Sequence, residues 1–128
     1  MKPTHLFLFD IDGTLISSGG AGEHALRLAV EELFNDKDGL DRIEIAGRTD
    51  QSISHAIFKK YGVEPTPEAV TGFLDRYLTH LADQLPQKQG RLLPGIVSLL
   101  DALKARPHVA LALLTGNLER GAELKLTH

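Results

Sequence analysis

The sequence predicts an α/β fold in which two strands of one parallel sheet are separated along the chain by a helical insertion. Two wholly apolar runs, residues 6–9 and residues 109–114, support this prediction, because such runs are typical of strands covered on both faces. Helical patterns fill most of the chain between them. Each apolar run stops at polar residues, and ligands of open α/β sheets bind at the carboxyl ends of the strands.

The first three helices of the insertion are indicated by their apolar spacing and their caps. The first is expected over residues 23–34, and the second begins after Thr49, a plausible N-cap, and ends before Gly62. The third is capped by Thr66, with Pro67 in its first helical position and a long apolar stripe behind it. Short loops between such helices favour an antiparallel bundle.

The rest of the chain returns to the sheet. Residues 15–22 form a Ser- and Gly-rich loop that could be a hinge or a plain connector, and residues 87–90 form a polar linker. A helix is expected over residues 96–103, and residues 118–126 form the helix that follows the second strand. The predicted division is a core of residues 1–15 and 91–128, and a helical insertion with hinge segments over residues 16–90.

Composition excludes several classes of protein. The chain has 128 residues, 42% of them hydrophobic and 24% charged, which is enough for one domain with a sizeable core. A net charge of −3 gives no electrostatic footprint for nucleic acid, and the absence of cysteine excludes disulfides and thiol chemistry. The six histidines are scattered, which disfavours a histidine metal site. With no signal segment and no spanning apolar stretch, a cytoplasmic protein with no nucleic-acid or membrane partner is expected.

The strongest site candidate follows the first strand, where Asp10 and Asp12 stand one residue apart before Gly13. An Asp-Gly turn by itself needs no chemistry. However, a turn does not need the second carboxylate, and two carboxylates so close repel each other unless something positive lies between them. A magnesium ion suits the position, because it prefers oxygen ligands and keeps open positions for phosphate. Asp10 and Asp12 are therefore the candidate catalytic and metal-binding residues.

The second strand ends in a matching way, at Thr115, Gly116 and Asn117, just before a helix. A hydroxyl and free backbone N–H groups at a strand-to-helix junction can bind a phosphate, although the same residues also make an ordinary turn and cap. Because two parallel strands would bring both polar ends to one edge of the sheet, these three residues are expected to bind the substrate.

The segment Asp10-Ile11-Asp12-Gly13-Thr14-Leu15 resembles the first motif of the haloacid dehalogenase superfamily, most of whose members are magnesium-dependent phosphatases, and Thr115 matches the second motif. Family members that cleave carbon–halogen bonds lack an acid at the Asp12 position, and cation-pumping ATPases carry Thr there. The helices between residues 20 and 85 resemble the cap of phosphoglycolate phosphatases and β-phosphoglucomutases. The resemblance implies a partial Rossmann-like core of the haloacid dehalogenase-like type with an inserted α-helical cap.

The resemblance also implies a mechanism for hydrolysis of a small phosphorylated metabolite. Asp10 would attack phosphorus and form an aspartyl-phosphate, while Asp12 would protonate the leaving alcohol and later activate water. In the family, the first carboxylate and the backbone carbonyl at the second Asp position hold Mg²⁺. Thr115, with the Gly116 amide, would hold the non-bridging oxygens.

A further candidate is Arg48, because Gly47-Arg48-Thr49-Asp50 resembles the cap segment that reaches over the substrate in that subgroup. The planar guanidinium of Arg48 suits a distal anionic group of the substrate, although an Arg before a helix is also a common solvated surface residue. Asp50 is expected to be a first-turn charge that complements the helix dipole.

The chain departs from the family pattern after the second motif. Family members continue with strands that supply a phosphate-binding Lys and an acidic pair, whereas Lys125 lies within the helix that follows Thr115 and is not assigned that role. We therefore expect a truncated piece of a longer enzyme with little or no turnover. A two-stranded sheet also leaves exposed edges, which would favour a dimer or domain swap.

Two alternatives remain open on the sequence. One keeps the enzyme but changes hydrolysis to phosphosugar mutase chemistry, and no residue decides between the two. The other is a non-catalytic binding module or domain-swapped remnant, in which the helical surface or a sheet edge contacts a partner.

Overall fold

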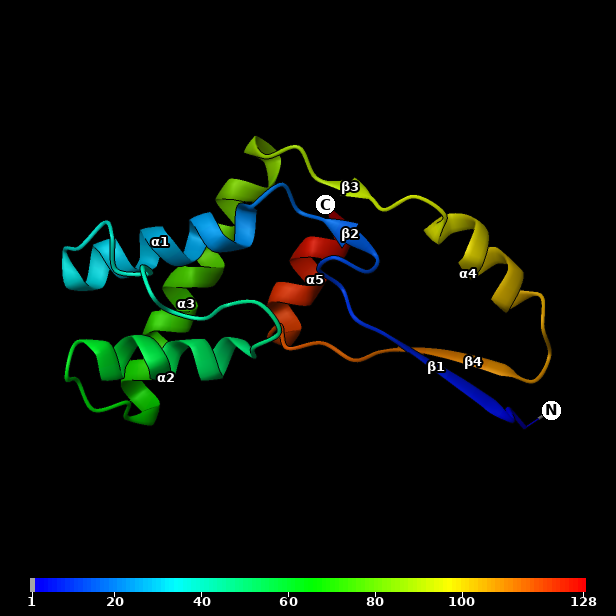
Figure 1. Cartoon of the computed structure of the whole chain (residues 1–128), viewed down its shortest axis with the longest axis horizontal. Coiled ribbons are helices and arrows are strands. Elements are labelled where there is room, and N and C mark those ends of the chain that lie inside the picture. The colour runs from blue at the N-terminus through cyan, green and yellow to red at the C-terminus, as the bar shows by residue number, and fades with distance from the viewer. Residues whose placement is uncertain (1) are drawn as a thin grey trace.

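The computed structural model describes residues 2–128 and has the α/β order that the sequence predicts (Figure 1). A parallel pair of strands lies at one end, and three inserted helices pack together at the other. The elements are β1 (His5–Phe9), β2 (Ile16–Ser17), α1 (Ala21–Phe34), α2 (Asp50–Lys60), α3 (Pro67–Gln84), a short 3-10 helix (Leu85–Gln87), β3 (Arg91–Leu92), α4 (Ile96–Lys104), β4 (Val109–Leu113) and α5 (Glu119–Thr127).

Strands β1 and β4 pair in parallel, as predicted. Their register runs from His5 opposite Val109 to Phe9 opposite Leu113, so the two strands end at the same level. The N–H of Leu114 donates to the carbonyl of Phe9 at 2.8 Å, which extends the pairing to the last residue of β1. The polar residues that follow the two strands therefore meet at one edge of the sheet.

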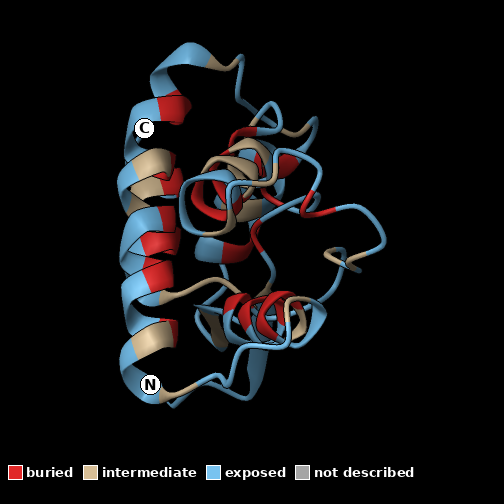
Figure 2. Cartoon of the chain, turned by 90° about the vertical axis from the view of Figure 1, so that its left-hand side faces the viewer, coloured by how far each residue is buried: buried red, intermediate tan, exposed pale blue. Residues whose placement is uncertain are grey.

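Helices α1, α2 and α3 form a layer with its own apolar core, here called the three-helix layer. The predicted caps are confirmed: the Thr49 hydroxyl accepts from the Ser52 N–H, and the Thr66 hydroxyl accepts from the Ala69 N–H. Figure 2 shows the buried residues gathered on the helix faces that point toward one another. The largest fully buried side chains of this core are Tyr77, Phe58, Ile57, Leu81 and Val30.

Two short strands that the sequence analysis does not predict join the sheet end to the three-helix layer. Ile16 and Ser17 of β2 pair antiparallel with Leu92 and Arg91 of β3. The expected hinge loop and the end of the linker are thus hydrogen-bonded to each other. A strand of two residues is too short to show the alternating pattern by which strands are recognised in a sequence.

Helix α5 lies between the sheet end and the three-helix layer (Figure 1). Its Gly121 approaches Leu78 and Leu81 of α3, with 3.5 Å between an ideal Cβ and Leu78 Cδ2. Its Ala122 belongs to a second, smaller core with Ile11 and Ile96. α5 therefore contacts both cores and holds the end of the sheet beside the helices.

The sheet itself is less covered than the apolar runs predict. Within residues 2–128, Leu6 and Leu8 of β1 and Leu113 of β4 are exposed, at 62%, 52% and 47%. The expectation of strands buried on both faces is therefore wrong for the described residues, while the expected open faces of a two-stranded sheet are present. Within the same residues, no helix has both the length and the apolar character needed to cross a membrane.

Candidate active site

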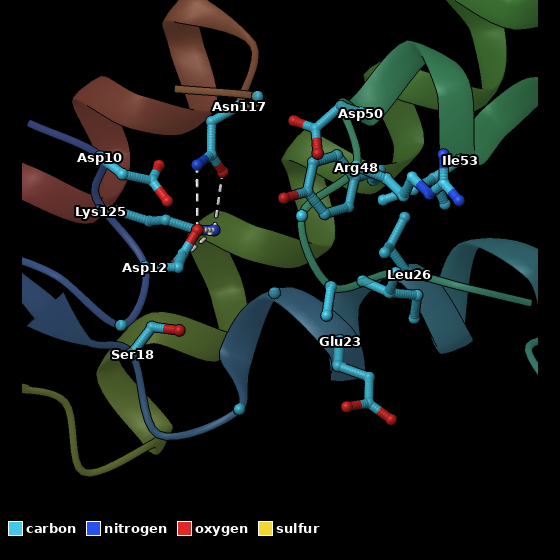
Figure 3. A pocket seen from close by; sticks show the side chains of 18 residues that line it. Asp10, Asp12, Ser18, Glu23, Leu26, Arg48, Asp50, Ile53, Asn117 and Lys125 are labelled. Atoms are coloured by element: carbon cyan, nitrogen blue, oxygen red, sulfur yellow. Dashed lines mark hydrogen bonds and ion pairs between the residues drawn. The ribbon is translucent and has the colours of Figure 1, made fainter. Parts of the chain in front are cut away.

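A cavity of about 440 Å³ lies where the ends of β1 and β4 face the three-helix layer (Figure 3). The sheet side contributes the turns that follow the two strands, and α5 contributes one side chain. Helices α1, α2 and α3 supply the opposite wall. The residues that line this cavity include Asp10, Asp12, Arg48, Asp50, Tyr77, Gly116, Asn117 and Lys125.

Asp10 and Asp12 stand in a tight turn at the end of β1. The Ile11 side chain between them is fully buried and anchors the turn, which leaves the two carboxylates on the exposed side. The turn closes through the Gly13 N–H, which donates to the Ile16 carbonyl at 2.9 Å, and Gly13 has a φ of 77° that favours glycine. One Asp10 oxygen accepts the Ile11 N–H at 2.8 Å. The other oxygen of Asp10 has no protein donor within residues 2–128.

Lys125 of α5 reaches this turn, although the sequence analysis leaves it without a role. Its ammonium donates to the two oxygens of Asp12 at 2.9 and 3.1 Å and to Asn117 Oδ1 at 2.7 Å (Figure 3). The Lys125 side chain is only 5% exposed, whereas that of Asp12 is 46% exposed. The positive charge that two neighbouring carboxylates require is thus supplied by a lysine.

The place of Lys125 along the chain is as the sequence analysis expects. Lys125 lies seven residues after Leu118 in the helix that follows the second motif, so it stands about two helical turns beyond the start of that helix. The structure confirms that Lys125 lies in the helix after Thr115, and its contacts with Asp12 and Asn117 bring it to the site, where the sequence analysis gives it no role.

The turn after β4 holds Thr115, Gly116 and Asn117 together, as the sequence predicts. The Thr115 hydroxyl accepts from the Asn117 N–H at 3.1 Å and from its side-chain amide at 2.8 Å. The same Asn117 amide donates to Asp12 at 2.9 Å. Gly116 and Asn117 line the cavity, whereas Thr115, expected to bind the substrate, is not among the lining residues and uses its hydroxyl to hold Asn117. An ideal Cβ on Gly116 would lie 2.7 Å from the Arg48 carbonyl, so only glycine fits.

Arg48 is one of the residues that line the cavity, but its guanidinium makes no contact with Asp10 or Asp12 among the described residues. The side chain runs away from Asp12 and Lys125 (Figure 3) and pairs with Glu44. Its side chain is 52% exposed, as a solvated surface residue would be. The structure therefore does not place this guanidinium beside the other predicted site residues.

Asp50 and Tyr77 are two buried cavity residues that the sequence analysis does not assign to the site. Asp50 stands in the first turn of α2, as expected, but it is only 7% exposed and accepts the Leu118 N–H at 2.8 Å. Burial raises the pKa of Asp50, an effect opposed by the Leu118 hydrogen bond and the Lys125 charge. Tyr77 is 1% exposed, and burial raises the pKa of its phenol.

The sequence analysis expects a magnesium ion at Asp10 and Asp12, and the oxygen atoms present there can be compared with what magnesium requires. Within residues 2–128 no cluster of three His, Cys, Asp or Glu side chains is present. Asp10 nevertheless has a carboxylate oxygen without a protein donor, and the Asp12 backbone carbonyl accepts no backbone hydrogen bond from these residues. Two hard oxygen ligands suit a magnesium ion that keeps several waters. The Asp12 carboxylate, which holds Lys125, is not a free ligand.

Comparison with known proteins shows the protein family to which this chain belongs. The family model described as haloacid dehalogenase-like hydrolase matches residues 7–128, so the chain belongs to this family of hydrolases. No curated protein matches the chain.

Solved structures show the same fold. A hydrolase from Pseudomonas syringae has 21% identity and a TM-score of 0.73, with 97% of this chain and 55% of that chain covered. A protein described as a predicted phosphoglycolate phosphatase from Haemophilus somnus has 22% identity and a TM-score of 0.62, with 99% and 57% covered. CbbY from Rhodobacter sphaeroides, solved in complex with phosphate, has 18% identity and a TM-score of 0.70, with 97% and 58% covered. The chain thus spans little more than half the length of each.

Proposed function

We propose that this chain carries the site of a magnesium-dependent phosphatase that hydrolyses a small phosphorylated metabolite through an aspartyl-phosphate at Asp10. One observation supports the proposal above all. The Asp10 carboxylate opens into the same cavity as the Lys125 ammonium and the Gly116 turn, so a nucleophile and an anion site face one space.

The chemistry follows from the charges around that space. A phosphate ester binds beside Lys125, Asn117 and the Gly116 N–H, which offset its negative charge. The free oxygen of Asp10 then attacks phosphorus, and the bond from phosphorus to the leaving alcohol breaks. Magnesium, when held by the Asp10 carboxylate and the Asp12 carbonyl, supplies the charge that lets an anionic nucleophile approach an anionic phosphate.

Asp12 acts as the general acid and then as the general base. In the structure its carboxylate is held by Lys125 and Asn117 on the side of the turn that faces the cavity. A phosphate bound at Lys125 competes with Asp12 for the ammonium, so that Asp12 can carry a proton to the leaving oxygen. The same carboxylate then takes a proton from the water that hydrolyses the aspartyl-phosphate, with release of inorganic phosphate.

The cavity limits the substrate to a small molecule. Its volume of about 440 Å³ falls within the ordinary range for small-molecule sites, and Leu26 and Ile53 of the three-helix layer close one side. We propose that this layer is the cap of the enzyme and that residues 1–15 and 91–128 are its core. Two solved structures of the same fold are described as a "predicted" and a "putative" phosphoglycolate phosphatase, which is consistent with a phosphate monoester as substrate. The cytoplasmic location stays a prediction.

The test is phosphate release from a panel of small phosphate monoesters, with and without Mg²⁺. In this proposal Lys125 is the cation that faces the phosphate, and the Asp10 oxygen that accepts no protein hydrogen bond within residues 2–128 is a ligand for the metal. We therefore expect slow, magnesium-dependent release that falls to the background rate in Asp10→Asn. Asp101→Asn, an exposed residue of α4, is the matched control and should behave as wild type. Release that is absent, or unchanged in Asp10→Asn, would overturn the proposal.

A further inference from the structure

The turn that follows β4 is held from the far side of the cavity by one residue of α2. The N–H of Asp50 donates to the Gly116 carbonyl at 2.9 Å, and the Asp50 carboxylate accepts the Leu118 N–H at 2.8 Å. Two hydrogen bonds from a single residue thus bracket the turn at residues 116–118. They join segments that lie 68 positions apart in the chain.

We propose that Asp50 is a positioning residue, which locks the three-helix layer onto the anion-binding turn and sets the place of α5 and its Lys125. The proposal rests on the function proposed above, because it concerns the same anion site. It differs from the expectation for Asp50 as a first-turn charge of α2.

The cap of α2 does not need the Asp50 carboxylate. Thr49 already supplies the side-chain oxygen at the N-terminus of α2, where its hydroxyl accepts the Ser52 N–H. The Asp50 carboxylate turns instead to the N-terminus of α5, whose own N-cap, Leu118, has no side-chain acceptor. Asp50 therefore caps α5 from another element of the fold, and a helix N-terminus favours a carboxylate there.

The capped helix is the one that carries Lys125. The Asp50 hydrogen bond holds Leu118, the N-cap residue directly before α5, and Lys125 lies seven residues further along, where its ammonium donates to Asp12 at 2.9 Å. Asp50 touches neither the proposed nucleophile nor the ammonium by hydrogen bond. Its effect on the site passes through the turn and the helix, which makes it a positioning residue.

Beside Asp50, the three-helix layer and the turn that follows β4 approach each other closely. An ideal Cβ on Gly116 would lie 2.7 Å from the Arg48 carbonyl and 3.0 Å from Thr49 Cα, and one on Gly121 would lie 3.9 Å from an Asp50 oxygen. The glycine at position 116 is thus required for the close approach of the two layers, whereas a Cβ at Gly121 would make only an ordinary contact. Because burying a carboxylate is costly, a 7% exposed Asp50 with a hydrogen-bond donor from the other layer indicates a specific contact.

The test compares Asp50→Ala, Asp50→Asn and the control Glu68→Ala. Glu68 is the first-turn acid of α3 and is exposed, so it reproduces the helix-dipole role without the contact to another layer. Amide hydrogen exchange at Leu118 directly measures the protection that its hydrogen bond to the Asp50 carboxylate provides. We expect Leu118 exchange to accelerate by about tenfold or more in Asp50→Ala, the factor that the loss of a hydrogen bond to a charged acceptor gives. Asp50→Asn, which keeps an acceptor oxygen, should restore most of the protection, and Glu68→Ala should match wild type.

Equal Leu118 exchange in wild type and Asp50→Ala would overturn the proposal. If Asp50→Ala does not fold, Asp50→Asn decides: a protected Leu118 supports the proposal, and an unprotected one contradicts it. With a phosphate monoester as substrate, Asp50→Ala should raise KM and lower kcat for the folded protein, with rescue by Asp50→Asn. A purely structural role would lower only the folded fraction and leave KM unchanged.

The failure of this inference and the failure of the proposed function give different results. Phosphate release that depends on Asp10, together with unchanged KM and kcat in Asp50→Ala, would refute the role of Asp50 and leave the phosphatase proposal standing. No release dependent on Asp10 would refute the phosphatase proposal, and Leu118 exchange would still decide whether Asp50 holds the turn.

Discussion

Replacing Lys125 with methionine is the substitution for which the structure gives the clearest energetic expectation. Methionine keeps the length of the apolar stem and removes the ammonium. Three hydrogen bonds are lost, two to Asp12 and one to Asn117 Oδ1, all from a side chain that is 5% exposed. The variant therefore breaks a largely buried ion pair and leaves Asp12 and Asn117 without their shared donor.

The expected loss in the free energy of unfolding depends on how far water can solvate Asp12 once the ammonium is gone. Breaking a fully buried pair costs about 3–5 kcal/mol, but Asp12 is 46% exposed and keeps the Asn117 amide as a donor at 2.9 Å. We therefore expect a loss of about 2–3 kcal/mol in the free energy of unfolding. For a chain of 128 residues this corresponds to a fall in Tm of roughly 7–11 °C.

The assay is urea and thermal unfolding followed by circular dichroism. Lys104→Met is the matched control, because Lys104 occupies the last turn of α4 as Lys125 occupies the last turn of α5, but it is exposed and makes no ion pair within residues 2–128. The free energy of unfolding of Lys104→Met should stay within about 0.5 kcal/mol of the wild-type value. If Lys125→Met also stays within that margin, the buried ion pair is not formed in solution and the reasoning fails.

Three further predictions concern packing and titration. Gly39→Ala would place a Cβ 2.5 Å from the Tyr61 hydroxyl, so we expect a loss of about 1–3 kcal/mol in urea unfolding, and an unchanged midpoint would contradict the packing. Burial and the Asp36 hydrogen bond raise the pKa of Tyr61 to about 12, and burial also raises the pKa of Tyr77. Absorbance at 295 nm should therefore show little phenolate in the native protein at pH 11. Full ionisation of both tyrosines at that pH would refute this prediction. Burial raises the folded-state pKa of Asp50, so the native state binds its proton more tightly than the unfolded chain, and this residue's contribution to stability should fall as pH rises from about 4. Wild type should lose stability relative to Asp50→Asn over that range, and a constant difference would count against the burial effect.

Local signals in the sequence predict most of the fold. Thr49 and Thr66 cap helices as expected, because capping depends on a residue and the backbone a few positions away. The pairing of β1 with β4 is also predictable, since two apolar runs separated by a long excursion favour a parallel sheet. The pairing of β2 with β3 is not, because each strand has two residues and depends on the packing of the elements around it.

The candidate site is predictable only in part, for a physical reason. Asp10, Asp12 and the turn at residues 115–117 follow strands, so sheet geometry alone brings them to one edge. Lys125 and Asp50 reach the cavity through the packing of α5 and α2, which no local pattern specifies. The Arg48 guanidinium depends on a rotamer and on its partner Glu44, and a motif carries no information about either.

The central claim is that Asp10 faces an anion site built from the two strand ends and Lys125. Beryllium fluoride tests it most directly, because it bonds to an ionised carboxylate oxygen and takes the place of a phosphoryl group, and bound fluoride is resolved by ¹⁹F NMR. With Mg²⁺ present, the account predicts bound-fluoride signals in wild type, their loss in Asp10→Asn and clear weakening in Lys125→Met. Signals that are absent in wild type, or that persist unchanged in Asp10→Asn, would contradict it.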